Sequence, residues 1–299
     1  MGGSDKNPKS GTFLHALNPL GNFWSKLAHG FAPSILEGDC CQIGYEGSDG
    51  VSIQIENLNK SFGKHHVLKN INLNIHPGET FSIIGPSGTG KSLLLKHIVK
   101  LESADSGQIL INGHDVNKTE SINENRNFRY SMVFQSSALF NSLTVGENVG
   151  LWLREKRICS EVRIRRIIQE KLQLVGLAGK EELRTSELSG GMRKRVAIAR
   201  SLAMNPDLIL YDEPTAELDP VTSDELAKVI MSLKKKVNLT TIIVSHDLNF
   251  ALYLSDRVAM MHDGEVIAIG TPDEIKKSQN PIVRNFIYTT TKGIQGEGE

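Results

Sequence analysis

The feature that most limits how this chain can fold is a glycine-rich stretch, GPSGTGKS, at residues 85–92. It follows a short apolar run, FSII, of the kind that forms a buried strand, and it precedes KSLLLKHIVK, which has the apolar spacing of a helix. A glycine-rich loop between a strand and a helix is the context that identifies a phosphate-binding P-loop. The sequence therefore predicts an α/β protein with a parallel core sheet that binds a nucleoside triphosphate at this loop.

Each residue type in this loop has a physical role in holding ATP. The glycines allow successive backbone N–H groups to face a phosphate, the Lys91 ammonium can reach the β/γ oxygens, and the Ser92 hydroxyl can ligate Mg²⁺. Phe62, upstream in KSFGK, can stack on the adenine face or be an ordinary core aromatic, and the sequence leaves both interpretations open. Within the loop, the predicted ATP-binding residues are Gly85, Pro86, Ser87, Gly88, Thr89, Gly90, Lys91 and Ser92.

Polar residues at the ends of other predicted strands complete the site. Asp212 ends the apolar run LILYD and can hold Mg²⁺, directly or through water, while the adjacent Glu213 can orient and polarise the attacking water. His246 follows TTIIVS and Gln135 follows MVF, so both are expected at the same edge of a parallel sheet. We therefore predict Glu213, His246 and Gln135 as catalytic residues. The predicted Mg²⁺ ligands are Ser92, Gln135 and Asp212.

Composition narrows the class of protein further. Lys plus Arg and Asp plus Glu both number 34, so no overall positive field attracts nucleic acid, and no nucleic-acid partner is expected. The apolar runs are far shorter than the roughly 20 residues of a membrane-spanning helix. The three cysteines have neither the spacing of a metal site nor that of a disulfide framework, which favours a reducing compartment. These features are typical of an intracellular α/β protein.

The sequence pattern divides the chain into three regions. Residues 1–50 are rich in Gly, Ser, Asn and Pro and are expected to be loosely ordered; a segment that contacts a membrane or partner, or a plastid transit peptide, is an alternative. Residues 51–275 are expected to form the catalytic domain, with an antiparallel β subdomain from VSIQIENL and INLNIH, and a hairpin from DRVAMMHDGEVIAIG. Residues from about 136–188 predict an inserted helical subdomain, and residues 276–299 a C-terminal extension.

A second phosphate-binding element follows the helical insertion. Ser189, Gly190, Gly191 and Met192 begin a helix in the sequence ELSGGMRKR, and the unpaired N–H groups and dipole of a helix N-terminus attract an anion. Because this terminus lies on a different subdomain from Lys91, we do not expect the two elements to hold the same ATP. The simplest arrangement that uses both is a two-fold homodimer in which each chain closes over the ATP of the other.

The order of these motifs, from the P-loop and Gln135 through LSGGM and LILYDEP to LD and His246, resembles that of the ATPase subunit of ABC transporters. The resemblance covers roughly residues 51–275 and implies the P-loop ABC ATPase fold. It also implies that Phe62 stacks on adenine, that Gln135 senses both Mg²⁺ and the transmembrane partner, and that LSGGM is the signature acting on the other subunit's ATP. Asp219 would be the D-loop aspartate that faces the other subunit.

Two residues depart from the usual pattern of that family. Met192 replaces the commonest glutamine and leaves the phosphate-facing Ser-Gly-Gly intact. Glu217, in AELD, occupies a position where a small residue is usual. The resemblance therefore does not predict how tightly the two ATP sites of the dimer are coupled.

The stretch MVFQSSALFNSLTVGENV, together with LSGGM and the tail NPIVRNFIYTTTKGIQG, is similar to the ATPases of Mce/Mla-type lipid transport systems. Small residues after Gln135 would leave a groove for a helix of a membrane subunit, with Phe140 as an anchor; alternatively, Leu139 and Phe140 pack the helical subdomain. The resemblance implies two partners, a multi-pass permease subunit and an MCE-domain lipid-binding subunit. It places the ATPase at the cytoplasmic face of the inner (plasma) membrane, or on the stromal side in a plastid.

The main alternative function is that of the ATPase of another ABC transporter, such as a polar amino-acid importer, with a permease of a different type. Chromosome-maintenance ATPases share the motifs but separate the P-loop from the signature by a very long coiled coil, which is not seen between residues 91 and 189. Translation factors of the family carry two cassettes, and this sequence shows one. The complete set of Lys91, Asp212, Glu213 and His246 argues against a protein that does not hydrolyse ATP.

Overall fold

The computed structural model describes residues 50–116 and 128–292. The expectations for residues 1–50 therefore fall, apart from Gly50, outside the described part of the chain, and so does the end of the C-terminal extension. Within the two described ranges, no helix combines the length and the apolar character that crossing a bilayer requires.

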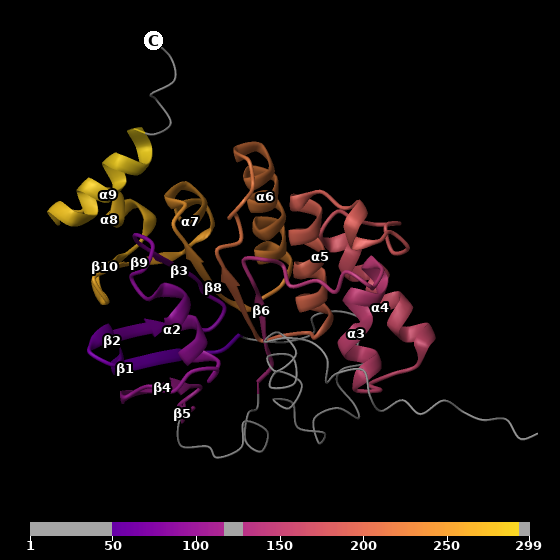
Figure 1. The fold of residues 1–299 in the computed structure, drawn as a ribbon, viewed down its shortest axis with the longest axis horizontal. Helices are drawn as coiled ribbons and strands as arrows, with labels where there is room; N and C mark the ends of the chain where they lie inside the picture. The colour runs from indigo at the N-terminus through magenta and orange to yellow at the C-terminus, as the bar shows by residue number, and fades with distance from the viewer. Residues whose placement is uncertain (1–49, 117–127, 293–299) are drawn as a thin grey trace, which may run out of the picture.

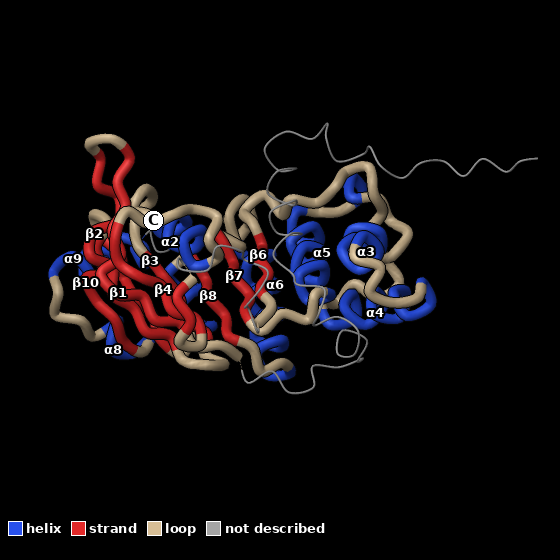
Figure 2. The backbone as a smooth tube through the Cα atoms, turned by 90° about the horizontal axis from the view of Figure 1, so that it is seen from below, coloured by secondary structure: helices blue, strands red, loops and turns tan. Residues whose placement is uncertain are grey.

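Two sheets form the body of the molecule (Figure 1, Figure 2). The first is antiparallel, in the order β2-β1-β4-β5, and consists of β1 Ile53–Phe62, β2 His65–Ile75, β4 Ser106–Ile111 and β5 His114–Asp115. The second has the order β10-β9-β3-β8-β7-β6, and consists of β3 Thr80–Ile84, β6 Tyr130–Val133, β7 Leu208–Asp212, β8 Thr240–Ser245, β9 Arg257–His262 and β10 Glu265–Gly270. In it, β6, β7, β8, β3 and β9 are parallel and β10 is antiparallel to β9. The predicted α/β fold class is confirmed.

The burial of the strands follows from their sequences. The first half of β1 alternates between buried and exposed residues, because only one face of the antiparallel sheet packs on the core. In contrast, β3, β6 and β8 are buried along their whole length, as expected for parallel strands covered on both faces. At the β9–β10 turn, Asp263 and Gly264 have positive φ angles of 48° and 82°, which suits a tight hairpin turn. The predicted hairpin is thus present.

The helices cover the second sheet and form a lobe beside it (Figure 1). They are α2 Lys91–Ile98, α3 Val145–Glu155, α4 Glu161–Leu174, α5 Gly190–Ala203, α6 Pro220–Lys236, α7 Leu248–Leu254, α8 Pro272–Lys276 and α9 Pro281–Lys292, with a short 3₁₀ helix at Thr185–Glu187. The first turn of α3 is fixed by a capping box, in which Thr144 and Glu147 each accept a hydrogen bond from the other's backbone N–H. In both views α3 and α4 lie beside α5, at the end of the molecule away from the antiparallel sheet (Figure 1, Figure 2).

The second sheet divides the core into two main apolar clusters. Ile209 and Tyr211 of β7 point to one side, where they pack with α3, α4, α5 and α6. Leu208 and Leu210 of the same strand point to the other side and pack with α2 and the antiparallel sheet. A smaller cluster joins α7, α8 and α9 to the sheet through β9. The helical lobe and the antiparallel sheet are therefore attached to opposite faces of the same sheet.

The register of the parallel strands determines where the site forms. Ile84, at the end of β3, lies opposite Ser245, at the end of β8. Asp212, at the end of β7, lies opposite Val244 of β8. The three strands therefore end at one level, and the loops that follow them emerge at the same edge of the sheet.

Candidate active site

The loop between β3 and α2 has a backbone that requires glycine at two points. Gly85 has a φ of 144°, and a Cβ there would lie only 2.1 Å from the backbone oxygen of Met261. Gly90, with a φ of 94°, is the N-cap residue of α2, and no side chain caps this helix. The first-turn N–H groups of α2 thus have no side-chain acceptor, an arrangement that suits a bound phosphate.

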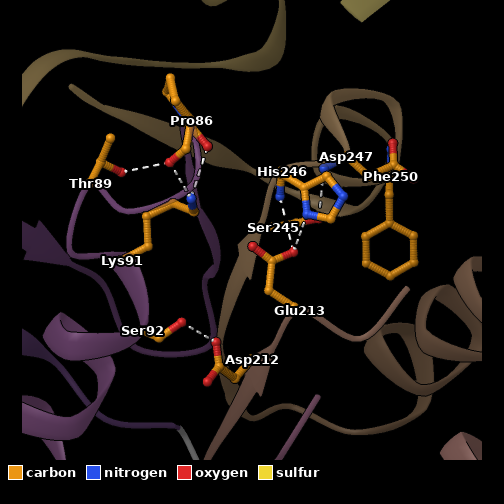
Figure 3. Close-up of polar contacts among 11 residues, drawn as sticks. Pro86, Thr89, Lys91, Ser92, Asp212, Glu213, Ser245, His246, Asp247 and Phe250 are labelled. Atoms are coloured by element: carbon orange, nitrogen blue, oxygen red, sulfur yellow. Dashed lines mark hydrogen bonds and ion pairs between the residues drawn. The ribbon is translucent and has the colours of Figure 1, made fainter. Parts of the chain in front are cut away.

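Lys91, the first residue of α2, is folded back into this loop (Figure 3). Its Nζ donates hydrogen bonds to the backbone oxygens of Gly85 and Pro86, both at 2.8 Å, and the Thr89 hydroxyl donates to the Pro86 oxygen at 3.0 Å. The side chain is buried, and this burial lowers the pKa of its ammonium, although two nearby carboxylates oppose the shift. The ammonium is therefore placed to exchange neutral carbonyl partners for phosphate oxygens, which would hold its charge better.

Ser92 and Asp212 meet across 120 residues of sequence, where the serine hydroxyl donates a hydrogen bond of 2.6 Å to the carboxylate (Figure 3). Burial raises the pKa of the Asp212 carboxyl, while the hydrogen bond from Ser92 acts in the opposite direction. A hydroxyl and a carboxylate side by side are hard oxygen donors of the kind that Mg²⁺ prefers. These two residues therefore fit a Mg²⁺ ion, whose charge would also offset the burial of Asp212.

Glu213 and His246 form the second polar contact at this edge (Figure 3). The carboxylate of Glu213 accepts from His246 Nδ1 at 2.7 Å and from the backbone N–H of His246 at 3.1 Å. Glu213 has a φ of 48°, and its own N–H donates to the Val244 oxygen at 2.9 Å, so its backbone leaves β7 in a sharp turn. The Glu213 side chain is 13% exposed and that of His246 56%. The histidine thus holds the carboxylate from the solvent side.

Gln135 lies close to this edge, two residues beyond the end of β6. Its side chain is exposed, whereas its backbone oxygen accepts a hydrogen bond from the buried ammonium of Lys194 in α5. The structure thus shows a contact that holds the backbone of Gln135. Its predicted roles as Mg²⁺ ligand and catalytic residue stay predictions.

The predicted signature forms the start of α5. Ser189 is the N-cap residue, and its hydroxyl accepts from the Met192 N–H at 3.2 Å. Gly191 lies against α6, since a Cβ there would be 2.4 Å from Thr222 Cγ2. Thr222 in turn donates to the Asp219 carboxylate through its N–H at 3.0 Å and its hydroxyl at 2.6 Å, and these bonds lower the pKa of Asp219. In both views α5 lies well away from α2, beside the helical lobe (Figure 1, Figure 2).

The burial of the side chains bears on two interpretations that the sequence left open, those of Phe62 and of the Leu139–Phe140 pair. Phe62 is 50% exposed at the end of β1, with the ammonium of Lys60 5.1 Å from its ring centroid, so it is not a core aromatic. Leu139 packs against the core cluster of the helical lobe, which agrees with the packing interpretation of that side chain. The peptide of Phe140 is hydrogen-bonded on both sides by the buried Asn148 side chain, which fixes the position of this residue.

Sequence reasoning missed two buried cations of α5, Lys194 and Arg200. Both are about 5% exposed or less, and both donate to backbone oxygens of the segment after β6. A signal existed in the spacing, because Lys194 precedes the buried Ala197 and Ile198 by three and four residues and therefore shares their face of the helix. A cation on an apolar helix face needs a partner, and the partner here is the backbone at Gln135.

The chain is similar to known proteins over most of its length. The family described as "ABC transporter" matches residues 68–216. The chain is 39% identical to the probable ribonucleotide transport ATP-binding protein mkl of Mycobacterium leprae, over 84% of this chain and 72% of that protein. It is 39% identical to protein TRIGALACTOSYLDIACYLGLYCEROL 3, chloroplastic, of Arabidopsis thaliana, over 86% and 79%. It is also 40% identical to the sulfate/thiosulfate import ATP-binding protein CysA of Nitrosomonas europaea, over 79% and 66%.

Among solved structures, the fold is similar to that of the ATP-binding cassette MJ0796, described as dimeric, in a post-hydrolysis state and bound to ADP and Pi. The TM-score is 0.65 at 34% sequence identity, and the match covers 74% of this chain and 98% of that one. The likeness therefore spans nearly all of that cassette and about three quarters of this chain.

Proposed function

Because the chain belongs to the ABC transporter family, we propose that it works as a homodimer that drives a multi-pass permease moving lipid between membranes. Its reaction is the ATP hydrolysis coupled to transport that characterises the family. The observation that carries the catalytic part of the proposal is the contact between Glu213 and His246, 2.7 Å apart at the sheet edge that also bears the P-loop.

Within one chain, the residues divide the work of hydrolysis. The N–H groups of the P-loop and the Lys91 ammonium bind the phosphates and neutralise their charge. Glu213 accepts a hydrogen bond from the attacking water and directs its lone pair, while His246 keeps that carboxylate in place and shields it from solvent. Mg²⁺, when held by Ser92 and Asp212, would supply further charge neutralisation on the phosphates.

The dimer is supported by the separation of the two phosphate-binding elements. Helix α5, which begins after Ser189, lies away from α2 in both views (Figure 1, Figure 2), so the N–H groups at the starts of the two helices would serve one ATP only if it lies between two chains. The dimeric state of the similar cassette MJ0796 agrees with this arrangement. In the proposed dimer, Ser189 to Met192 and Asp219 face the nucleotide held by the partner's P-loop.

The lipid cargo is supported by the similarity to the Arabidopsis protein, whose name is that of a galactolipid, over 79% of its length. We propose a permease and an MCE-domain lipid-binding subunit as partners, at the cytoplasmic face of the inner membrane or on the stromal side in a plastid. The second candidate is the ATPase of a small-solute importer, which the 40% identity to the sulfate/thiosulfate importer CysA favours.

The catalytic part is tested with Glu213→Gln. The amide cannot accept a proton from water, so hydrolysis should fall by a factor of about a hundred or more, while ATP still binds. ATP should then hold two chains together, and size-exclusion chromatography with light scattering would detect the dimer. Glu265→Gln, at the exposed start of β10, is the matched control and should hydrolyse ATP at the wild-type rate. Undiminished hydrolysis by Glu213→Gln would exclude the role given to Glu213.

The cargo is tested by purifying the subunit from its native membrane in mild detergent and identifying the co-purifying proteins by mass spectrometry. A permease together with an MCE-domain subunit supports lipid transport. A permease with a substrate-binding protein for small anions favours the second candidate. Recovery without any membrane partner would contradict both.

A further inference from the structure

Two buried cations from one helix hold the segment that follows β6. Lys194 of α5 donates to the backbone oxygen of Gln135, and Arg200 donates to those of Ser137 at 2.9 Å and Ala138 at 2.8 Å. Ser137 and Ala138 adopt positive φ angles of 62° and 46°, which residues other than glycine keep only where the surroundings hold them. The backbone shape of this segment therefore depends on α5.

Lys194 is the member of this pair that lies near the catalytic carboxylates. Its side chain is only 4% exposed, and burial lowers the pKa of its ammonium. Three carboxylates oppose that shift, of which Glu217 has the largest influence, followed by Asp212 and Glu213. A buried ammonium is costly unless opposite charge lies close by, so Glu217 contributes to keeping Lys194 charged where it is.

Glu217 belongs to the loop between β7 and α6, and this loop and the first turn of α6 both contact the first turn of α5. A Cβ on Gly190 would lie 3.3 Å from Leu218, and one on Gly191 would lie 2.4 Å from Thr222. Glu217 is itself exposed, with a φ of 67°, so packing does not explain a large side chain at this position. The neighbouring Leu218 lies against Gly190, one helical turn before Lys194, and the negative charge of Glu217 raises the pKa of that buried lysine.

We propose that Lys194 is a positioning residue that links the segment after Gln135 to the Ser189 end of α5, with Glu217 as its counter-charge. The inference rests on the proposed function, in which Ser189 and Asp219 meet the partner's ATP and Gln135 serves the chain's own site. A shift of α5 or of the Glu217 loop at the dimer contact then moves the Gln135 backbone through one hydrogen bond. The departure from the family pattern at Glu217 thus acquires a physical reason.

The first test is a double-mutant cycle on the ATPase rate of the full chain. Lys194→Met should lower kcat by about tenfold, because it removes a charge-assisted hydrogen bond, and Glu217→Gln by about threefold, because it removes an exposed charge. The KM for ATP should change little in both, since neither residue lines the P-loop. In the double variant kcat should equal that of Lys194→Met, because Glu217 acts through the lysine, rather than fall by the product of the two effects.

Two further variants separate charge from packing. In a Lys194→Arg background, which keeps the cation, Glu217→Gln should still lower kcat. Lys234→Met is the matched control, because Lys234 also donates to a backbone oxygen, that of Leu254 at 2.9 Å, and to a carboxylate, that of Asp256 at 2.8 Å. It lies outside the site and should leave kcat unchanged.

The second test needs no turnover. Amide hydrogen exchange of residues 134–140 in the nucleotide-free chain should be faster in Lys194→Met, less so in Glu217→Gln, and unchanged in Lys234→Met. If Lys194→Met yields too little folded protein, the exposed position of Glu217 still allows this measurement on Glu217→Gln. Multiplicative effects on kcat, or unchanged exchange in Glu217→Gln, would overturn the inference. Full hydrolysis by Glu213→Gln would instead overturn the proposed function. The hydrogen-exchange result would then still test whether Lys194 and Glu217 hold the Gln135 backbone.

Discussion

The helices α2 and α5 both begin beside a glycine, but their first turns are completed in different ways. At the N-terminus of α2, Gly90 is the N-cap in a left-handed conformation, and no side chain caps the helix. The buried Lys91 is folded back against neutral carbonyl groups. At the end of α5, the Ser189 hydroxyl accepts from the Met192 N–H. The first turn of α2 therefore has no side-chain cap, whereas in the first turn of α5 the Met192 N–H is already bonded to Ser189.

The aspartates next to the two helices show the same difference in their pKa values. Burial raises the pKa of Asp212, which lies beside Ser92 of α2. Two hydrogen bonds from Thr222 lower the pKa of Asp219, which lies beside the start of α5. The P-loop region thus has charges that a ligand would stabilise, whereas the signature region is already stable and offers a formed surface to a partner.

The largest expected effect comes from a substitution at Lys91, the P-loop residue that begins α2. Lys91→Ala removes the one side-chain cation in the P-loop, and the loss of charge-assisted hydrogen bonds to phosphate should weaken ATP binding by about a hundredfold. Titration with a fluorescent ATP analogue would measure this. The α5 end has no part in the first binding step, so Ser189→Ala should leave the affinity of the single chain for ATP unchanged.

The matched control for Lys91→Ala is Lys96→Ala, on the same helix. Lys96 is exposed, and its removal should alter ATP affinity by less than about twofold. Equal ATP affinity in Lys91→Ala and the wild type would contradict the assignment of the phosphate site to α2.

A substitution at Gly191 is expected to disturb the contact between the first turn of α5 and α6. Alanine normally favours a helix interior over glycine by about 1 kcal/mol, but a Cβ at Gly191 would lie 2.4 Å from Thr222 Cγ2. Thr222 cannot easily rotate, because its hydroxyl donates to Asp219 at 2.6 Å. Gly191→Ala should therefore move α5 away from α6 and lower ATPase activity by about tenfold, while ATP binding to the single chain, measured by titration, stays the same.

The clash can be removed from the other side. Thr222→Ser deletes the methyl group and keeps the hydroxyl that donates to Asp219. Adding Thr222→Ser to Gly191→Ala should restore most of the activity, and Thr222→Ser alone should have little effect. Failure of this rescue would show that the space between the two helices is not what Gly191 preserves.

Much of this arrangement could be predicted from the sequence because it depends on local patterns. The strand, glycine loop and helix around Lys91 identify the P-loop, and the apolar runs that end at Asp212 and Ser245 identify parallel strands. Parallel register then brings their ends to one edge of the sheet, so Glu213 and His246 are expected to be neighbours. Their contact at 2.7 Å agrees with that expectation.

The connections that sequence did not predict are those between side chains and distant backbone. Nothing local to Lys194 indicates that its ammonium reaches the backbone oxygen of Gln135, 59 residues earlier. The left-handed Ser137 and Ala138 are similarly unexpected, since neither residue type favours that conformation. Such contacts follow from how α5 packs beside the end of β6, and packing of this kind requires the three-dimensional structure.

The smallest expected effect sharpens the contrast between Asp212 and Asp219. Because burial raises the folded-state pKa of Asp212, this carboxyl contributes stability below its ordinary value of 3.8, and the contribution is lost as pH rises through the raised pKa. Asp212→Asn keeps an acceptor for Ser92 and removes the buried charge. At neutral pH it should raise the Tm of the nucleotide-free chain by about 2 °C, while Mg²⁺-dependent hydrolysis is lost.

The contribution of Asp219 to folding stability depends on pH in the opposite direction. Its pKa is lowered by the Thr222 hydrogen bonds, so its stabilising contribution is present above 3.8 and is lost as pH falls through the lowered pKa. Asp219→Asn should therefore lower the Tm at neutral pH. Thermal melts of both variants and the wild type between about pH 4.5 and 8 would measure the differences, and that of Asp212→Asn should grow as pH rises through the raised pKa and then stay constant. A fall in Tm for both variants at neutral pH would mean that the Asp212 site is already satisfied without a ligand, and the contrast between the two helix ends would fail.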